Sequence, residues 1–276
     1  MNTTNYSKLD HPLINQFLFH PRKSNQSSND SDLINYLIPI DDTVQIGAKL
    51  HMKDHQFPTI LFFHGNGEIA SDYDDLASEY HQVGLNFIPV DYRGYGTSTG
   101  SPSASTMIKD AHAIFTHIRN WLDKEGYTGS LIIMGRSLGS ASALEIAFSY
   151  SQQYKGLIIE SGFANTIPLL RRLGISTEAL SLTEDDGFRN IQKIQSVVSP
   201  TLILHARHDQ IIPIEDAELL QSFSGARNKQ LQIVPHADHN TIIMVAGKLY
   251  FTEIKKFVDK IDGKREKRFF RKKVTP

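Results

Sequence analysis

Six short apolar runs, each of strand length, recur along the chain and constrain its fold more than any other feature. They are Thr59–His64, Phe87–Val90, Leu131–Met134, Leu157–Ile159, Thr201–Leu204 and Leu231–Val234. Strands that are apolar on both faces are typical of a parallel sheet covered by helices on each side. Most of the intervening segments have helical patterns, and this alternation with short links predicts an α/β fold with right-handed crossovers.

The predicted helices lie between and after these strands. They are Ile69–Val83, Ser105–Glu125, Ser137–Tyr150, Glu215–Ser222 and Thr241–Ile261. In the second of them, apolar residues recur mostly at three- and four-residue steps, which is the spacing of one helix face. Ahead of the parallel strands, the runs Leu33–Ile40 and Val44–Met52 are separated by two aspartates and predict an antiparallel pair.

The polarity of the chain divides it into three parts. Residues 1–32 are expected to form an N-terminal arm that ends in a polar surface loop over residues 20–32. Residues 33–262 carry the pattern of one α/β domain, and 40% hydrophobic residues in a chain of 276 supply a sizeable core. Inside this domain, a segment at about 163–199 lacks a strand pattern and predicts a lid above the strand ends. Residues 263–276 form a basic tail.

The tail differs in charge from the rest of the chain. It carries seven basic residues and one acidic residue, a net charge of +6 in a chain whose total is −1. Charge runs at chain ends are usually solvated, and we interpret the tail in this way. Weak contact with an anionic membrane is the alternative, and no nucleic-acid partner is expected.

The composition excludes several classes of protein. The chain has no cysteine, which excludes a disulfide scaffold, a thiolate zinc site and a cysteine nucleophile. No apolar run approaches the ~18–20 residues that span a bilayer. The first eight residues lack the basic and apolar regions of a secretory signal, so a cytoplasmic location is expected.

Two segments match the pattern Gly-x-Ser-x-Gly, and their contexts differ. Gly135–Gly139 follows directly after a predicted strand and precedes a helix rich in small residues. This strand–turn–helix geometry exposes a serine hydroxyl on a sharp bend. Gly96–Gly100 lies in a turn-rich stretch where no helix can begin promptly. We therefore predict Ser137, and not Ser98, as a nucleophile.

A serine hydroxyl is a poor nucleophile until a base removes its proton, and histidine is the first choice near neutral pH. His239 follows the last predicted strand at the start of a helix, and we favour it over His236, which is nearer the strand. A carboxylate must hold the imidazole in the right tautomer. The loops at the carboxyl ends of parallel strands open on one face, so residues there can meet. We favour Asp209, just past the penultimate strand, and Glu160, at the end of the neighbouring strand, is the alternative.

Acyl transfer also needs donors for the developing oxyanion. One is expected to be the backbone N–H of Leu138, the residue after the nucleophile. The other is expected from Asn66, in the glycine-rich loop after the first parallel strand. A phosphate cradle is the alternative for that loop, but the Gly-x-Gly-x-x-Gly spacing is missing. The sequence also gives little support for a metal hydrolase, because neither His205–Asp209 nor His236–His239 has the His-x-x-x-His spacing of two metal ligands on one helix face. No metal or cofactor is expected.

As a set, these segments resemble serine hydrolases of the α/β-hydrolase superfamily, in particular uncharacterised bacterial hydrolases related to eukaryotic lipid esterases and protein depalmitoylases. The resemblance covers about residues 33–260 and rests on His64–Gly67, Asp91–Gly100, Gly135–Gly139, Glu160–Phe163, His208–Pro213 and Asp238–Asn240. It implies an α/β-hydrolase fold, with a mostly parallel central sheet, helices on both faces and a short lid insert. By this resemblance Ser137, Asp209 and His239 match the family's nucleophile, acid and base. Asn66 and Leu138 match its oxyanion hole.

These residues predict a hydrolase that cleaves carboxylic esters through an acyl-enzyme, with a small-molecule or lipid-like acyl ester as substrate. Thioesters, lysophospholipids or peptides could use the same centre. Arg171 and Arg172 of the lid could then meet an anionic head group. A non-catalytic binding protein on the same fold is the alternative from another class, and its mark would be a broken triad.

Overall fold

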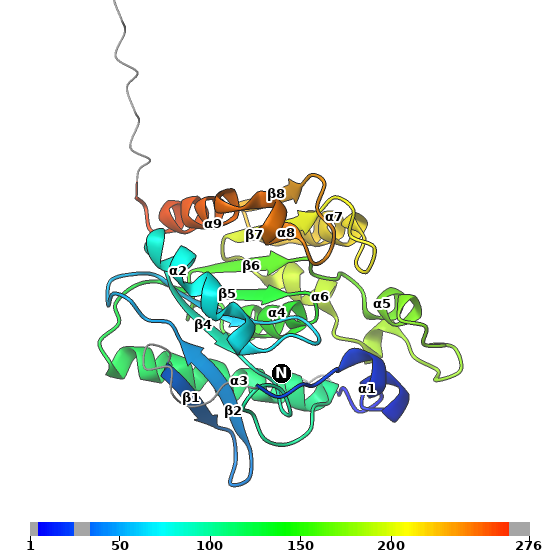
Figure 1. Ribbon diagram of the computed structural model, residues 1–276. Helices are drawn as coiled ribbons and strands as arrows, with labels where there is room; N and C mark the ends of the chain where they lie inside the picture. The colour runs from blue at the N-terminus through cyan, green and yellow to red at the C-terminus, as the bar shows by residue number, and fades with distance from the viewer. Residues whose placement is uncertain (1–4, 25–33, 265–276) are drawn as a thin grey trace, which may run out of the picture.

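The computed structural model describes residues 5–24 and 34–264, which are built around one eight-stranded sheet (Figure 1). The strands are β1 (Ile34–Pro39), β2 (Gln45–Leu50), β3 (Thr59–Phe63), β4 (Asn86–Val90), β5 (Leu131–Arg136), β6 (Gly156–Glu160), β7 (Thr201–Ala206) and β8 (Lys229–Val234). Their order is β1-β2-β4-β3-β5-β6-β7-β8. The pairs β1–β2 and β2–β4 are antiparallel, and the other neighbours are parallel. The predicted antiparallel pair and the six predicted parallel strands are confirmed.

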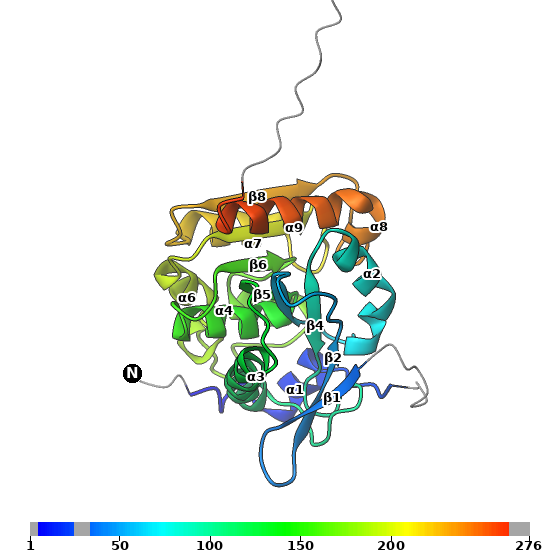
Figure 2. The ribbon, with the colours of Figure 1, turned by 90° about the vertical axis from the view of Figure 1, so that its left-hand side faces the viewer.

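Helices cover both faces of this sheet. Within the described residues they are α1 (Pro12–Leu18), α2 (Asp74–Gln82), α3 (Ala104–Lys124), α4 (Gly139–Ser149), α5 (Thr166–Arg172), α6 (Asn190–Ser196), α7 (Ile214–Phe223), α8 (Ile242–Ala246) and α9 (Lys248–Ile261), with 3₁₀ turns η1 (Ala70–Tyr73) and η2 (Glu184–Asp186). Helices α2, α8 and α9 pack on one face, and α3, α4, α6 and α7 on the other (Figures 1 and 2). This is the α/β-hydrolase architecture that the sequence resemblance implies.

The strands are apolar throughout because each face of the sheet has its own core. In β3, Ile60 and Phe62 belong to the core beneath α2 and α9, whereas Leu61 and Phe63 belong to the core beneath α3 and α4. Successive side chains of a strand point to opposite faces. A sheet covered on both sides therefore requires an apolar residue at nearly every strand position.

Two of the predicted helices differ from those observed. The segment predicted over Ile69–Val83 opens with the 3₁₀ turn η1 before α2 begins. The single helix predicted over Thr241–Ile261 is wrong, because Gly247 ends α8 and α9 starts after it. Gly247 has a φ of 54°, a conformation that glycine adopts without the steric cost a side chain would add.

The N-terminal arm and the insert between β6 and β7 lie near each other at the carboxyl ends of the parallel strands (Figure 1). The insert, predicted as a lid over residues 163–199, folds into α5, η2 and α6. The arm contains the short helix α1. The predicted boundary at residues 32 and 33 and most of the basic tail, from residue 265, lie outside the described residues. In the described part of the chain, no helix combines the length and apolar character needed to cross a membrane.

Candidate active site

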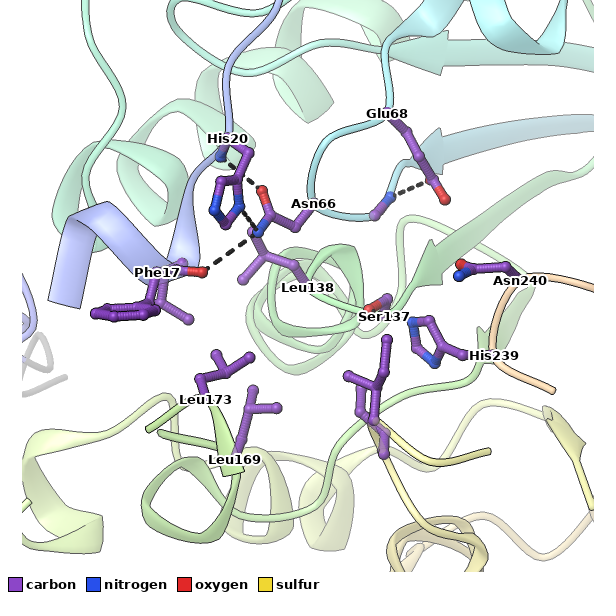
Figure 3. Close-up of a pocket in the computed structure, with 14 residues that line it drawn as sticks. Phe17, His20, Asn66, Glu68, Ser137, Leu138, Leu169, Leu173, His239 and Asn240 are labelled. Carbon is purple, nitrogen blue, oxygen red and sulfur yellow. Dashed lines mark hydrogen bonds between the residues drawn. The ribbon is translucent and has the colours of Figure 1, made fainter. Parts of the chain in front are cut away.

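Ser137 lies on the sharp turn between β5 and α4. Its φ of 52° is positive, a strained conformation for a residue with a side chain. The flanking glycines let helix and sheet approach closely. A Cβ on Gly139 would lie 2.1 Å from the carbonyl oxygen of Phe63, and a Cβ on Gly135 would lie 2.4 Å from that of Gly139. The turn presents Ser137 to a pocket at the strand ends (Figure 3).

The imidazole of His239 lies between this serine and a buried carboxylate. Its Nε2 is 2.9 Å from Ser137 Oγ, and its Nδ1 is 2.7 Å from Asp209 Oδ2. An ionised carboxylate can only accept hydrogen bonds, so Nδ1 carries the proton and Nε2 is left to accept one from the serine. The structure therefore brings together the three side chains that the sequence singled out as nucleophile, acid and base.

Asp209 is held in its ionised form despite its burial. Loss of solvent raises its pKa, but the hydrogen bond from His239, the electrostatic attraction of that ring and the backbone N–H of Ile212 together hold the pKa below its usual value. The N–H groups of Ile211 and Ile212 donate to Oδ1 at 3.0 and 2.8 Å, which leaves Oδ2 for the imidazole. A carboxylate oriented in this way can stabilise an imidazolium during proton transfer.

The residues that competed for these roles lie elsewhere. Ser98 is buried, and its hydroxyl accepts a hydrogen bond from the N–H of Gly47. Glu160 is buried at the end of β6, where it accepts a hydrogen bond from the Tyr250 hydroxyl, and burial raises its pKa. His236 is exposed on the loop after β8. Among the described residues, no group of three or more His, Asp or Glu side chains is arranged to hold a metal ion.

Asn66 and Leu138, the predicted oxyanion donors, line the same pocket as Ser137. Leu138 is the N-cap residue of α4, where the helix dipole adds positive potential. In the described part of the chain, neither backbone N–H has a hydrogen-bond partner, whereas the neighbouring Gly65 N–H donates to Glu68 Oε2 at 2.7 Å. An oxyanion donor must have an N–H that is free in this way.

The pocket has a volume of about 230 Å³ and a mostly apolar wall. Sequence reasoning did not assign much of its lining to the site: Phe17, Leu18 and His20 of the arm, Glu68, Ile211 and Ile212 after β7, and Asn240. Leu169 and Leu173 come from the predicted lid. Arg171 and Arg172 are not part of the lining and instead pair with Glu178 and Asp216. The structure thus gives no support to a head-group role for these two arginines.

Arg136, the last residue of β5, connects the loop of the candidate base to the strand of the candidate nucleophile. Its Nε lies 3.1 Å from Glu68 Oε1 and 3.5 Å from Glu160 Oε1, and the side chain is 8% exposed. Its Nη2 donates to the backbone oxygen of His239 at 3.0 Å. Burial lowers the pKa of the guanidinium, but the two carboxylates outweigh burial and raise it. In return, the Arg136 charge helps to hold the pKa of Glu68 below its usual value against the effect of burial.

Removing this cation is expected to destabilise the fold. The variant Arg136→Met leaves the buried Glu160 and the partly buried Glu68 without their shared partner. Breaking a buried ion pair costs about 3–5 kcal/mol. Urea unfolding followed by circular dichroism should show this loss in the free energy of unfolding. The control Arg227→Met replaces an exposed arginine and should stay within about 0.5 kcal/mol of the parent. Equal stabilities for the two variants would contradict the assigned role.

Known proteins share this sequence pattern and fold. Residues 54–182 match the family model described as serine aminopeptidase, S33. The alpha/beta hydrolase domain-containing protein WAV2 of Arabidopsis thaliana is 28% identical over 242 residues, which cover 80% of this chain and 78% of that protein. The Pyrococcus furiosus esterase Pf2001 superposes with a TM-score of 0.70 at 16% identity, covering 88% of this chain and 98% of that one. A monoacylglycerol lipase from Paleococcus ferrophilus gives a TM-score of 0.60 at 16% identity, covering 75% and 96%.

At these identities, the likeness to the solved structures establishes a shared fold. The curated relative extends the likeness to sequence over most of the chain. The mostly parallel sheet and the strand–turn–helix geometry at Ser137 match what the sequence resemblance implies. The chain is therefore a member of the α/β-hydrolase superfamily.

Proposed function

We propose that this chain is a serine hydrolase that cleaves carboxylic ester bonds through an acyl-enzyme intermediate. The observation that carries the proposal is the placement of the His239 imidazole, 2.9 Å from the Ser137 hydroxyl and 2.7 Å from the Asp209 carboxylate. A base within hydrogen-bonding distance of a serine, itself oriented by a buried carboxylate, is the arrangement that activates a hydroxyl for nucleophilic attack.

The proposed reaction has two stages. Ser137 Oγ attacks the ester carbonyl carbon as its proton passes to His239 Nε2, and the N–H groups of Asn66 and Leu138 stabilise the oxyanion. His239 then protonates the leaving alcohol, and the acyl group stays on the serine. In the second stage, His239 removes a proton from water, which attacks the acyl carbon. The bond to Ser137 Oγ then breaks, Oγ takes the proton back from His239, and the carboxylic acid leaves. These steps use the chain's own residues and water, without a cofactor.

The lining of the pocket favours acyl esters over peptides. Glu68 is its acidic residue, and this carboxylate is already paired with Arg136 and accepts hydrogen bonds from the Gly65 N–H and the Tyr73 hydroxyl. An aminopeptidase needs an available anion for the free amino terminus of its substrate, whereas an apolar acyl group needs only the apolar wall. The names of the Pf2001 esterase and the monoacylglycerol lipase are in line with an ester substrate.

Labelling with a fluorophosphonate probe tests this function directly. The probe is expected to modify the parent chain, and peptide mapping should place the modification on the peptide that contains Ser137 and not on the one that contains Ser98. The same preparation should hydrolyse p-nitrophenyl butyrate and hexanoate. Acyl thioesters and aminoacyl p-nitroanilides are assayed alongside. Turnover of either of these without ester turnover would make that compound class, and not esters, the substrate. A chain that is neither labelled at Ser137 nor active on any of these substrates would overturn the proposal.

A further inference from the structure

The N-terminal arm, residues 5–24, forms one wall of the candidate active site. Phe17, Leu18 and His20 line the pocket together with Ser137, although more than a hundred residues separate them in the chain. Figure 3 shows Phe17 near Leu169 and Leu173, which come from the insert between β6 and β7. The apolar part of the pocket therefore lies between α1 of the arm and α5 of the insert.

Buried side chains fix the arm against the domain. Leu9 and Ile14 are fully buried, and Leu18 is 2% exposed. The hydroxyl of Tyr6 accepts a hydrogen bond from the buried Lys193 of α6 at 3.1 Å, and the Asp10 carboxylate accepts one from the N–H of Ser105 at 2.9 Å. The arm is thus attached both to the insert and to the body of the domain.

A second set of contacts connects the arm to the candidate oxyanion loop through the side chain of Asn66. Its Oδ1 accepts hydrogen bonds from the His20 N–H at 2.8 Å and the Tyr95 hydroxyl at 2.9 Å. Its Nδ2 donates to the Phe17 carbonyl oxygen at 3.4 Å and to His20 Nδ1 at 2.7 Å (Figure 3). A backbone N–H can only donate and a carbonyl oxygen can only accept, so these partners fix the orientation of the amide. The side chain of Asn66 therefore joins the arm to the loop that carries the candidate oxyanion donor.

We propose that the arm determines the acyl-chain specificity of this site, and that Phe17 is the residue that limits the length of the acyl group. The inference rests on the proposed ester hydrolysis and adds a substrate class, esters of short to medium acyl chains. A cavity of about 150 Å³ holds one benzene molecule, so the 230 Å³ of this pocket would hold roughly nine carbon atoms. In Figure 3, Phe17 and Leu173 both lie on the side of the pocket that is farther from Ser137, where the end of a longer acyl chain would have to go.

Exchanging Phe17 for a smaller or a larger side chain tests the assignment. Phe17 is 39% exposed, so its truncation removes little of the core. In Phe17→Ala the ratio of kcat/KM for p-nitrophenyl decanoate to that for the butyrate should rise about tenfold, and in Phe17→Trp it should fall. Leu13→Ala is the matched control, because Leu13 lies on the same helix, is 52% exposed and does not line the pocket. Its ratio should equal that of the parent.

Two outcomes would overturn the inference. One is an unchanged chain-length profile in both Phe17 variants while ester turnover continues, and the other is an equal shift in Leu13→Ala. Failure of the proposed function gives a different result, with no turnover and no fluorophosphonate label in the parent. In that case, binding of carboxylates of 4 to 12 carbons, measured by thermal shift, replaces the kinetic ratio. If Phe17→Ala, but not Leu13→Ala, binds longer carboxylates than the parent does, the arm still limits the chain length. If the preferred carboxylate length is the same in both variants and the parent, the arm has no such role.

Discussion

Ser137→Ala is expected to lose almost all ester hydrolysis, with kcat lower by about 10⁴–10⁶. Without the hydroxyl, no acyl-enzyme can form, and His239 loses the group that its Nε2 contacts at 2.9 Å. The turnover that remains would come from the oxyanion donors and from substrate binding alone. Initial rates with p-nitrophenyl butyrate and labelling by the fluorophosphonate probe measure the two losses independently.

Ser98→Ala is the matched control, since Ser98 occupies the other Gly-x-Ser-x-Gly segment. Its hydroxyl accepts the Gly47 N–H at 2.8 Å, so the variant leaves a buried donor unpaired and should lose about 1–3 kcal/mol of stability. It should keep the kcat and the label of the parent below its unfolding transition. If labelling persists in Ser137→Ala and disappears in Ser98→Ala, the nucleophile is Ser98 and not Ser137.

The sheet could be predicted from the sequence because its strands are buried on both faces. In β3 and β5, nearly every residue is apolar, a pattern that a strand with one solvated face does not produce. Ser137, Asp209 and His239 could be selected because each follows a predicted strand, and the carboxyl ends of parallel strands share one edge of a sheet. Local sequence patterns were therefore enough to predict the place of residues that directly follow a strand.

Contacts between distant segments could not be predicted in the same way. The apolar residues Ile14, Phe17 and Leu18 follow Pro12 at helical spacing and could have indicated α1, since proline is frequent in a first helical turn. Nothing in that pattern states that Phe17 and His20 meet Asn66, because their hydrogen bonds join segments 46 to 49 residues apart. Arg136 directly precedes the serine in the sequence, but its position there says nothing of its partners. Its pairing with Glu68 and Glu160 depends on the tertiary structure.

Asp209→Asn is expected to lower kcat by about 10⁴ while the fold is kept. The amide has nearly the size of the carboxylate, and its oxygen can still accept the N–H groups of Ile211 and Ile212. Its NH₂ group donates where Oδ2 accepted, so Nδ1 of His239 becomes the acceptor and Nε2 carries the proton. The imidazole can then no longer remove the proton of Ser137. Steady-state kinetics and urea unfolding of the same preparation separate the loss of turnover from any loss of stability.

Glu160→Gln is the comparison variant for this experiment, because Glu160 is the other buried carboxylate that the sequence analysis considered as the acid. Its carboxylate contacts Arg136 and the Tyr250 hydroxyl, whereas Asp209 is the carboxylate that holds Nδ1 of His239. The amide should therefore weaken the pairing with Arg136 and lower stability, while kcat stays within about tenfold of the parent. Loss of turnover in Glu160→Gln alone would assign the acid to β6. A large fall in kcat without a matching fall in stability, found in Asp209→Asn alone, would identify Asp209 as the acid.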